Sequence, residues 1–210
     1  LYCKTACLMK IVIAGNYGAN NLGDELILEG LLVALRSNFP DSQITVLSGN
    51  PTQTAQKYNV MSVPKFPSGF RSLLKSIFKT NKTKSVVKNC DYFFLGGGGL
   101  FSNLSFKAYI IWAIQAFMAY HYKKPVIMYG QSVGPLNGRL QKWLIKKIFQ
   151  KSAFIAVRDE ESKNELKKIA VHKKIYIIPD LIFRIKAGRK SPTTKVKQVV
   201  VALRYLPELN

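Results

Sequence analysis

The sequence predicts an α/β protein built on a doubly wound parallel sheet. Short apolar runs of β-type composition alternate along the chain with longer amphipathic stretches, as strands and helices do in such a sheet. Glycine, asparagine and charged residues gather where the apolar runs end. The chain has 210 residues, of which 48% are hydrophobic, and this is enough for one such domain with a sizeable core.

The first half of the chain alternates strands and helices. Residues 10–14 (KIVIA) predict a buried strand, and residues 24–38 predict a helix with Ile27, Leu31 and Leu35 on one face. The remaining predicted elements are, in chain order, a strand at 43–48, a short helix at 52–58, an edge-like strand at 60–65 and a basic helical region at 68–89.

The second half continues the alternation, with predicted strands at 91–95, 125–129, 154–157 and 175–178 and predicted helices at 106–122, 138–152 and 160–169. The helix at 106–122 is expected to lie buried against the sheet, although Trp112, Phe117 and Tyr120 would also let it rest on a membrane surface. In the helix at 138–152, the expected core-facing residues are Leu140, Trp143, Leu144, Ile148 and Phe149.

The chain divides into four parts. Met9 opens the first strand, so residues 1–8 are expected to be upstream read-through or a tag. Residues 9–185 are predicted to form a Rossmann-like N-terminal domain. Residues 186–198 are polar and basic with glycine and proline, which is typical of a linker. Residues 199–210 are expected to hold the first strand of a truncated second domain.

The composition is strongly basic, with a formal net charge of +21 from 32 Lys and Arg against 11 Asp and Glu. Such a charge attracts phosphorylated substrates, nucleic acid or acidic lipid, although lysines also simply fill solvent-facing helix surfaces. The longest largely apolar run, 108–120, is shorter than the ~20 residues that span a bilayer. The three cysteines lack metal-ligand spacing. We expect a cytoplasmic protein without a metal, able to work at the inner face of the membrane.

The first strand-to-helix junction is the richest candidate ligand site. Its glycines allow close backbone approach, and the following helix N-terminus favours phosphate or carboxylate. The glycine spacing fits neither a dinucleotide fingerprint nor a Walker loop. A plain turn capped by Asp24 is the alternative. The candidate residues are Asn16, Tyr17, Gly18, Asn20, Asn21, Gly23 and Asp24.

Later junctions add further candidates, because ligands of doubly wound sheets bind beyond the carboxyl ends of the strands. Four glycines follow the strand at 91–95, and either a ligand or close helix–sheet packing would explain them. Arg158 follows a strand directly and suits phosphate or carboxylate, with an ion pair to Asp159 or Glu161 as the alternative. The candidates here are Gly97, Gly98, Gln131, Arg158, Asp159, Ser162 and Asp180.

An ordered set of motifs resembles the polysaccharide pyruvyl transferase family. They are GNYGANNLGDELILEGLLVALR, ITVLSGNP, DYFFLGGGGLF, KPVIMYGQSVGPL, FIAVRDEES and IPD, spread over residues 9 to 204. The resemblance implies half of a two-domain fold similar to GT-B glycosyltransferases. It also implies phosphoenolpyruvate as co-substrate, no other cofactor, and a cell-surface sugar or lipid-linked oligosaccharide as acceptor, on which a ketal forms.

The resemblance also implies roles for particular residues. Arg158 matches the family's anion-binding arginine and is the expected catalytic residue. Arg204 stands where the second domain's first strand usually ends in arginine. The family's Arg-Leu-His-type motif, whose histidine is the favoured acid, has no counterpart in these 210 residues. The chain by itself is therefore expected to be inactive.

Two other functions stay open. One is a GT-B-like glycosyltransferase that uses a sugar nucleotide. The other is a basic module that binds nucleic acid or anionic lipid. The lysines are spread over many helices and the sequence contains no RNA-binding motif, so no specific nucleic acid is expected. Peripheral membrane contact is compatible with the enzymatic functions, since acceptors can be lipid-linked.

Overall fold

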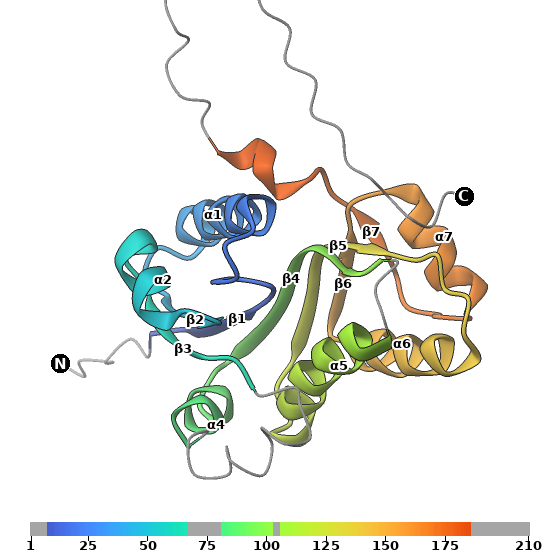
Figure 1. Cartoon of the computed structure of the whole chain (residues 1–210), viewed down its shortest axis with the longest axis horizontal. Coiled ribbons are helices and arrows are strands. Elements are labelled where there is room, and N and C mark those ends of the chain that lie inside the picture. Colours follow the sequence, from blue (N-terminus) through green and yellow to red (C-terminus); the bar gives the residue numbers. More distant parts are fainter. Residues whose placement is uncertain (1–7, 67–80, 103–105, 186–210) are drawn as a thin grey trace, which may run out of the picture.

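The computed structural model describes residues 8–66, 81–102 and 106–185, in which seven parallel strands form one sheet (Figure 1). The sheet order is β3-β2-β1-β4-β5-β6-β7. The strands are β1 Lys10–Ala14, β2 Gln43–Ser48, β3 Met61–Pro64, β4 Tyr92–Phe101, β5 Val126–Val133, β6 Phe154–Val157 and β7 Tyr176–Ile177. This arrangement confirms the predicted doubly wound parallel sheet, and β3 lies at its edge as expected.

Helices lie on both faces of the sheet (Figure 1). They are α1 Leu22–Asn38, α2 Pro51–Tyr58, α4 Asn81–Lys88, α5 Phe106–His121, α6 Arg139–Lys151, α7 Glu160–Lys168 and the 3-10 turn η1 Leu181–Arg184. The linker at 186–198, the strand expected at 199–203, residues 68–80 of the basic helical region and most of the leader lie outside the described residues.

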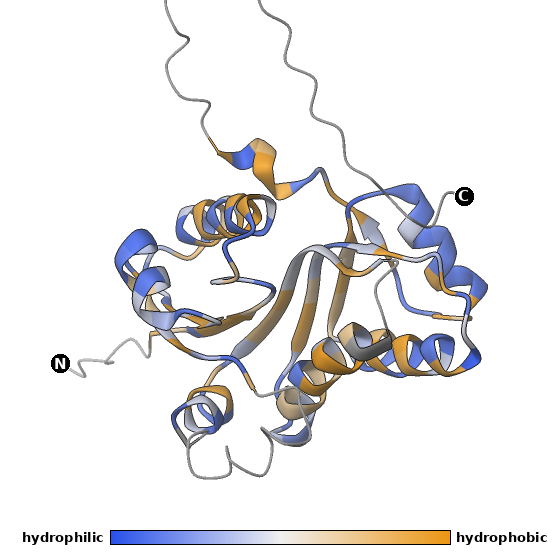
Figure 2. Cartoon of the chain, in the orientation of Figure 1, coloured by the Kyte–Doolittle hydropathy of each residue, from blue (hydrophilic) through white to orange (hydrophobic). Residues whose placement is uncertain are grey.

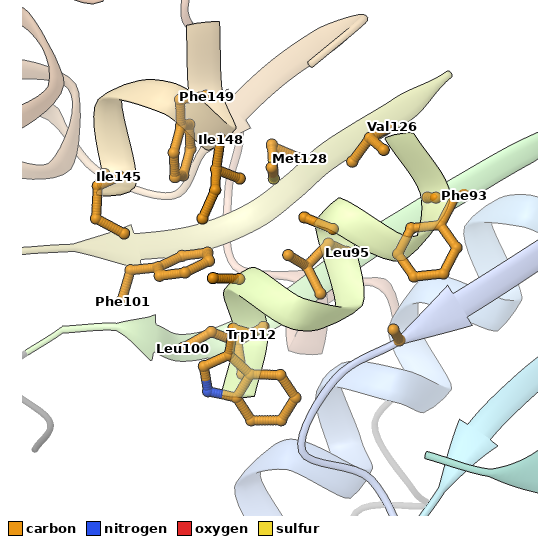
Figure 3. Packing of buried hydrophobic residues seen from close by; sticks show 14 of the residues in the cluster. Phe93, Leu95, Leu100, Phe101, Trp112, Val126, Met128, Ile145, Ile148 and Phe149 are labelled. Carbon is orange, nitrogen blue, oxygen red and sulfur yellow. The ribbon is translucent and has the colours of Figure 1, made fainter. Parts of the chain in front are cut away.

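Alternation along β1 divides the core into two clusters, because successive strand residues point to opposite faces. Ile11 and Ile13 pack with the buried leucines of α1, whereas Val12 and Ala14 face the opposite cluster. That second cluster, under α5 and α6, includes Phe93, Leu95, Phe101, Met128 and Phe149 (Figure 3). Figure 2 shows the resulting apolar strands between helices that are polar outside.

Glycine at position 30 of α1 lets η1 pack directly on that helix. A Cβ placed there would collide with the Leu181 carbonyl group, and the Leu181 side chain itself is buried. This contact places the end of the described chain against α1, so the segment after β7 returns to the face of the sheet that α1 covers (Figure 1).

Strands β4 and β5 run further than expected. The sequence pattern placed their ends at residues 95 and 129, but the structure extends them to Phe101 and Val133. The reason is mutual pairing: Gly96 aligns with Tyr129, Gly98 with Gln131 and Phe101 with Val133. Gly96–Gly99 therefore belong to the sheet instead of ending it, with an irregularity between Gly98 and Phe101.

Two expectations about helices need correction. Helix α1 begins at Leu22, where the Asn21 side chain accepts a hydrogen bond from Gly23 N at 3.1 Å, so Asn21 and not Asp24 is the cap. In α6, Leu140 and Trp143 are 57% and 55% exposed, so they do not face the core. At 100° per residue, Trp143 points about 170° away from the centre of the buried face formed by Leu144, Ile145, Ile148 and Phe149.

Helix α5 is packed against the sheet as expected. Tyr109, Trp112 and Tyr120 are buried. Of the three aromatic residues that would let this helix rest on a membrane, only Phe117 is therefore exposed. The Tyr120 hydroxyl donates to the Ile148 carbonyl oxygen at 2.7 Å and so joins α5 to α6. Among the described residues, no helix is long and apolar enough to cross a bilayer.

Candidate functional site at the carboxyl edge of the sheet

The predicted site residues gather in two groups at the carboxyl edge of the sheet. One group lies where the loop after β1 meets the glycine stretch inside β4, and it includes Asn16, Gly18, Asp24, Gly97 and Gly98. The other lies at the ends of β6 and β7 and includes Arg158, Asp159, Ser162 and Asp180. Arg204 lies outside the described residues.

Tyr17 braces the first loop from below. Its side chain is completely buried, and its hydroxyl donates a hydrogen bond to the Gly96 carbonyl oxygen at 2.7 Å. Burial, helped by the charges of Asp24 and Glu25, raises the pKa of Tyr17 above its ordinary value. Gly49 N donates to the Tyr17 carbonyl oxygen at 2.9 Å. In this structure Tyr17 ties the loop to β2 and β4, and its ring has no face open to a ligand.

Asp24 is the central acidic group of the first site. Its carboxylate is half-buried, lies next to Gly98 and accepts a hydrogen bond from Asn16 Nδ2 at 2.8 Å. Burial raises the pKa of Asp24, the Asn16 hydrogen bond opposes that rise, and the nearby Glu25 adds to it. The arrangement leaves a carboxyl group that can accept from a hydroxyl or exchange a proton with it.

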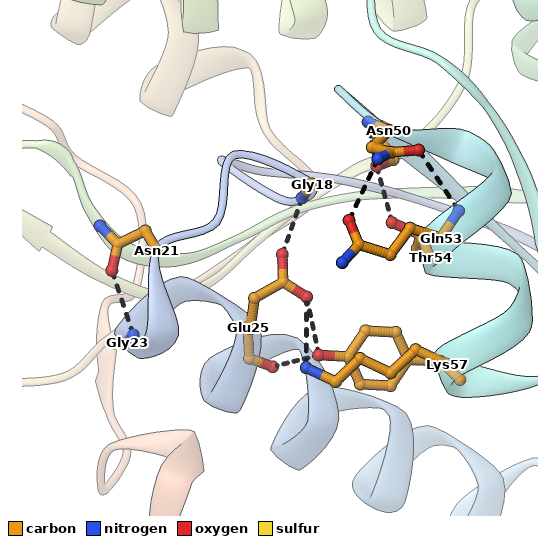
Figure 4. Close-up of polar contacts among 10 residues, drawn as sticks. Gly18, Asn21, Gly23, Glu25, Asn50, Gln53, Thr54 and Lys57 are labelled. Carbon is orange, nitrogen blue, oxygen red and sulfur yellow. Dashed lines mark hydrogen bonds and ion pairs between the residues drawn. The ribbon is translucent and has the colours of Figure 1, made fainter.

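Glu25 makes several polar contacts between the first loop and α2 (Figure 4). It accepts hydrogen bonds from Gly18 N and from the Tyr58 hydroxyl, each at 2.7 Å, and its carboxylate lies 3.9 Å from Lys57 Nζ. A cavity of about 210 Å³ opens here, lined by Gly18, Asn20, Glu25, Gln53 and Lys57 among others. Asn20, Asn21 and Gly23 lie exposed at the entrance to α1, where Asn21 caps the helix.

Arg158 is held between two carboxylates. Its Nε lies 3.3 Å from Asp159 Oδ2 and its Nη1 3.5 Å from Asp180 Oδ2, while the side chain stays 39% exposed. The ion pair that the sequence left open therefore forms with Asp159, and Asp180 joins it. Burial pushes the pKa of Asp159 up, but hydrogen bonds from Ser162 and Arg158 outweigh that effect and hold the pKa below its ordinary value.

Asp159, Ser162 and Asp180 also have structural partners. Asp159 caps α7 by accepting from Ser162 N at 2.7 Å, and Ser162 Oγ accepts from Val133 N at 2.9 Å. Asp180 caps η1 by accepting from Ile182 N at 3.2 Å. These contacts fix the direction of the Arg158 guanidinium, because both of its acidic neighbours are themselves anchored to backbone.

Gln131 connects the two groups from beneath. It aligns with Gly98 on β4 and with Val157 on β6. Its side-chain Nε2 donates to the Leu95 carbonyl oxygen at 2.6 Å, and its main-chain carbonyl oxygen accepts from Arg158 N at 3.1 Å. Among the described residues, its Oε1 and the Oγ of Ser132 are buried without a hydrogen-bond partner. Buried oxygens without a partner are uncommon in folded proteins, and of these two residues Ser132 also lines the cavity beside Arg158.

A second cavity, of about 430 Å³, lies beside Arg158. Its lining includes Ser102, Ser132, Gly134, Arg158, Ser162 and Lys168. The cavity also has three carboxylates in its lining, Asp159, Glu161 and Glu165, and Lys168 is paired with Glu165 at 2.7 Å. An anionic ligand would therefore depend on the hydroxyl groups and on Arg158 exchanging its carboxylate partners for a carboxylate or phosphate of the ligand.

Three residues outside the predicted set belong to this edge. Ser102 and Ser132 line the second cavity, and Ser132 could have been found because it follows Gln131 at the end of a strand. Lys65 follows β3, is partly buried, and has its Nζ 5.9 Å from the centre of the Trp112 ring. Burial lowers the pKa of Lys65, against the opposing charges of Asp24 and Glu25. The position of Lys65 directly after a predicted strand could have identified it as a candidate.

A parallel doubly wound sheet with helices on both faces defines a Rossmann-like α/β domain, with polar loops and two cavities at its carboxyl edge. Comparison with known sequences narrows this class. The model of the polysaccharide pyruvyl transferase family matches residues 21–205, so the chain belongs to that family. It is 24% identical over 192 residues to the amylovoran biosynthesis protein AmsJ of Erwinia amylovora, covering 78% of this chain and 46% of AmsJ.

A solved structure supports the fold. The chain resembles Anabaena HepE, determined in complex with UDP and glucose, with a TM-score of 0.52 and 13% sequence identity. The similarity covers 82% of this chain and 44% of HepE. The chain thus spans about half the length of the relatives it matches.

Proposed function

We propose that this chain is part of an enzyme that transfers a pyruvyl group from phosphoenolpyruvate to a sugar of a cell-surface polysaccharide, forming a ketal. Family membership over residues 21–205 carries the proposal. The similarity to AmsJ, whose name places that protein in amylovoran biosynthesis, supports a polysaccharide acceptor. We place the reaction in the cytoplasm, at the inner face of the membrane when the acceptor is lipid-linked.

The reaction makes defined demands on the site. An acid protonates the methylene carbon of phosphoenolpyruvate, a sugar hydroxyl oxygen bonds to the central carbon, and the carbon–oxygen bond to phosphate breaks. A second hydroxyl oxygen of the sugar then closes the ketal. One hydroxyl proton restores the acid and the other leaves with phosphate. Cations must therefore hold the donor's carboxylate and phosphate while charge develops on the leaving group.

Arg158 is the proposed donor-binding group. Its guanidinium borders the cavity of about 430 Å³, with Ser132 in the same lining. In the present structure its partners are the carboxylates of Asp159 and Asp180. A donor carboxylate or phosphate would take their place at the guanidinium, since bidentate Arg–anion pairs are strong.

The first group is proposed to bind the acceptor. Asp24 and Asn16 present a carboxylate and an amide already joined at 2.8 Å, a pair that suits vicinal sugar hydroxyls. The acid that protonates the methylene carbon, and a further cation at Arg204, are assigned to the second domain that the family resemblance implies. The scheme requires no metal ion.

Calorimetric titration of the chain with phosphoenolpyruvate tests the role of Arg158. We expect Arg158→Gln to weaken binding about ten- to hundredfold. A hydrogen bond to a charged group contributes about 1.5–3 kcal/mol, and the variant loses the charge on the donor. Arg184→Gln, at an exposed position of η1, removes the same charge and should bind as wild type does. Equal affinities of both variants would contradict the assignment.

Phosphate release from phosphoenolpyruvate, measured with free and lipid-linked sugars, tests the reaction itself. It should be compared between this chain and a longer protein that includes a second domain, with the pyruvyl ketal identified by mass spectrometry. Sugar-dependent phosphate release by the longer protein alone is the expected result. Release that is independent of sugar would point to hydrolysis instead.

A sugar-nucleotide glycosyltransferase is the second candidate. The observation in its favour is the fold shared with HepE, which was solved with UDP and glucose. Replacing phosphoenolpyruvate by UDP-glucose in the same titration separates the two functions. Tighter binding of UDP-glucose, with UDP released on addition of a sugar, would favour the glycosyltransferase.

A further inference from the structure

Helix α6 presents two large apolar side chains to solvent. Leu140 is 57% and Trp143 55% exposed, although the helix buries four other apolar residues against the core. Single exposed apolar residues are common, but tryptophan is enriched at surfaces that contact a partner or a membrane interface, and here it lies beside a second exposed apolar side chain. The core of this domain does not explain these two positions.

The same helix is strongly basic. Its thirteen residues contain no acid, and its exposed cations are Arg139, Lys142, Lys146, Lys147 and Lys151. Lys147 Nζ lies 5.9 Å from the centre of the Trp143 ring. By helical spacing, Arg139, Lys146 and Lys147 flank Trp143 on the outer face. An apolar centre therefore lies within a ring of positive charge.

The position of this face in the fold is also informative. Helix α6 connects the carboxyl end of β5 to the amino end of the parallel strand β6, so its first two turns, with Leu140 and Trp143, form the end of the helix nearer the carboxyl edge. That edge carries Arg158 and Asp24. A surface that engaged this turn would lie beside the candidate site and not at the opposite end of the sheet.

We propose that the outer face of α6 docks the protein on an anionic lipid bilayer. Tryptophan and leucine enter the headgroup region, and lysine and arginine stems extend so that their charges reach the lipid phosphates. A second copy of the chain fits this face poorly, because its own five cations would meet the same five. Docking stands independently of the reaction; under the proposed function it brings the carboxyl edge toward lipid-linked acceptors.

Trp143 provides a direct reporter. The chain contains two tryptophans, and Trp112 is only 5% exposed. In the Trp112→Phe variant, Trp143 emission should shift to shorter wavelength with vesicles of equal parts phosphatidylcholine and phosphatidylglycerol, and much less with phosphatidylcholine alone. In the matched Trp143→Phe variant, Trp112 emission should stay unchanged. Unchanged Trp143 emission with the anionic vesicles would overturn the proposal.

Cosedimentation with the same vesicles tests the charge. Lys146→Gln should weaken partitioning about fivefold, as expected for one basic side chain near an anionic surface, and Leu140→Gln should weaken it as well. Lys167→Gln, on the exposed face of α7, removes the same charge elsewhere and should have little effect. Equal losses for Lys146→Gln and Lys167→Gln would show attraction by net charge alone and overturn the assignment to α6.

The remaining occupants of this face are tested with the same variants. Circular dichroism checks that each variant is folded, which we expect because the other positions are exposed and Trp112→Phe replaces one buried aromatic ring by another. Trp143-dependent self-association in sedimentation velocity, or Lys146-dependent binding to a DNA duplex without binding to anionic vesicles, would each contradict a membrane as the partner.

Discussion

The hydroxyl of Tyr17 holds the first loop against the glycine-rich strand through one hydrogen bond, to the Gly96 carbonyl oxygen. We expect Tyr17→Phe to lower the free energy of unfolding by about 1–2 kcal/mol, since a buried acceptor loses its donor. Urea denaturation measures this loss. Tyr176→Phe, on a partly exposed ring, should change the free energy by less than about 0.5 kcal/mol. Similar changes in the free energy of unfolding for both variants would contradict the role of the Tyr17 hydroxyl in holding the loop.

Asp24 gives the chain a pH-dependent stability. Its pKa is raised in the folded state, so the charged form is penalised by folding at neutral pH. The penalty is relieved as pH falls through the raised folded pKa and is gone below the unfolded value. Asp24→Asn should therefore have the higher Tm at neutral pH, with a gap that closes toward the ordinary aspartate pKa of 3.8.

Thermal unfolding of wild type and Asp24→Asn across this acidic range provides the measurement. The gap in Tm should be small, since the carboxyl group is only half-buried. Asp41→Asn, at an exposed position between α1 and β2, serves as the control. If the difference in Tm between wild type and Asp24→Asn widened on acidification, the predicted direction of the pH dependence would be wrong.

The sequence predicted where individual site residues lie in the fold, but not which way their side chains point. Polar residues after strands must lie at the carboxyl edge of a parallel sheet, and Arg158 and Asp24 do so. Which way each side chain points depends on tertiary partners that local sequence does not reveal. Tyr17 and Gln131 turn inward to backbone carbonyl groups, while Ser132 borders the cavity. Ligand contact by the predicted set stays a prediction.

Strand β4 depends on glycine at position 98. Gly98 has a φ of +71°, and a Cβ there would lie 2.9 Å from Asp24 Oδ1. We expect Gly98→Ala to destabilise the fold by about 1–3 kcal/mol. Gly23→Ala is the matched change, because its Cβ would meet only ordinary contacts inside α1; it should be neutral or stabilising by up to about 1 kcal/mol. Chemical denaturation of both variants distinguishes backbone strain from loss of glycine as such.

Helix α6 has a core face that differs from the one its sequence first indicated. Phe149 is fully buried and packs edge-on against Phe101 with ring centres 5.5 Å apart. Phe149→Ala should cost about 3–5 kcal/mol, whereas Trp143→Ala should cost less than about 0.5 kcal/mol. Denaturant midpoints report both. A large loss of stability in Trp143→Ala would show that Trp143 packs in the core after all.

The type and order of the elements followed from the sequence, because apolar runs of strand length alternate with amphipathic stretches. Their ends did not. Four glycines ordinarily interrupt a strand, yet β4 passes through them because β5 pairs alongside as far as Val133. Spacing alone also could not separate Leu140 and Trp143 from the true core face, because apolar residues occur on both sides of α6.

At the scale of the whole molecule, the parallel sheet brings residues far apart in sequence to one edge. This is why the sequence could predict that the candidate residues lie along one edge of the sheet. The two hollows, one beside Glu25 and one beside Arg158, were not foreseeable, because each depends on how loops and helix ends close around the edge. Residue Arg204 and the strand expected at 199–203 lie beyond the described residues, and their roles stay predictions.

The interior position of β1 in the sheet has a consequence for folding during synthesis. One of its neighbours, β2, follows soon after it, but the other, β4, lies 81 residues further along the chain, as the Lys10–Asp91 contact shows. At about 5–20 residues per second, a ribosome needs about 4–16 s to supply that partner. During this interval the middle of the future sheet is an unpaired apolar edge. We expect nascent chains halted before β4 to recruit chaperones, and chains halted after β5 to release them.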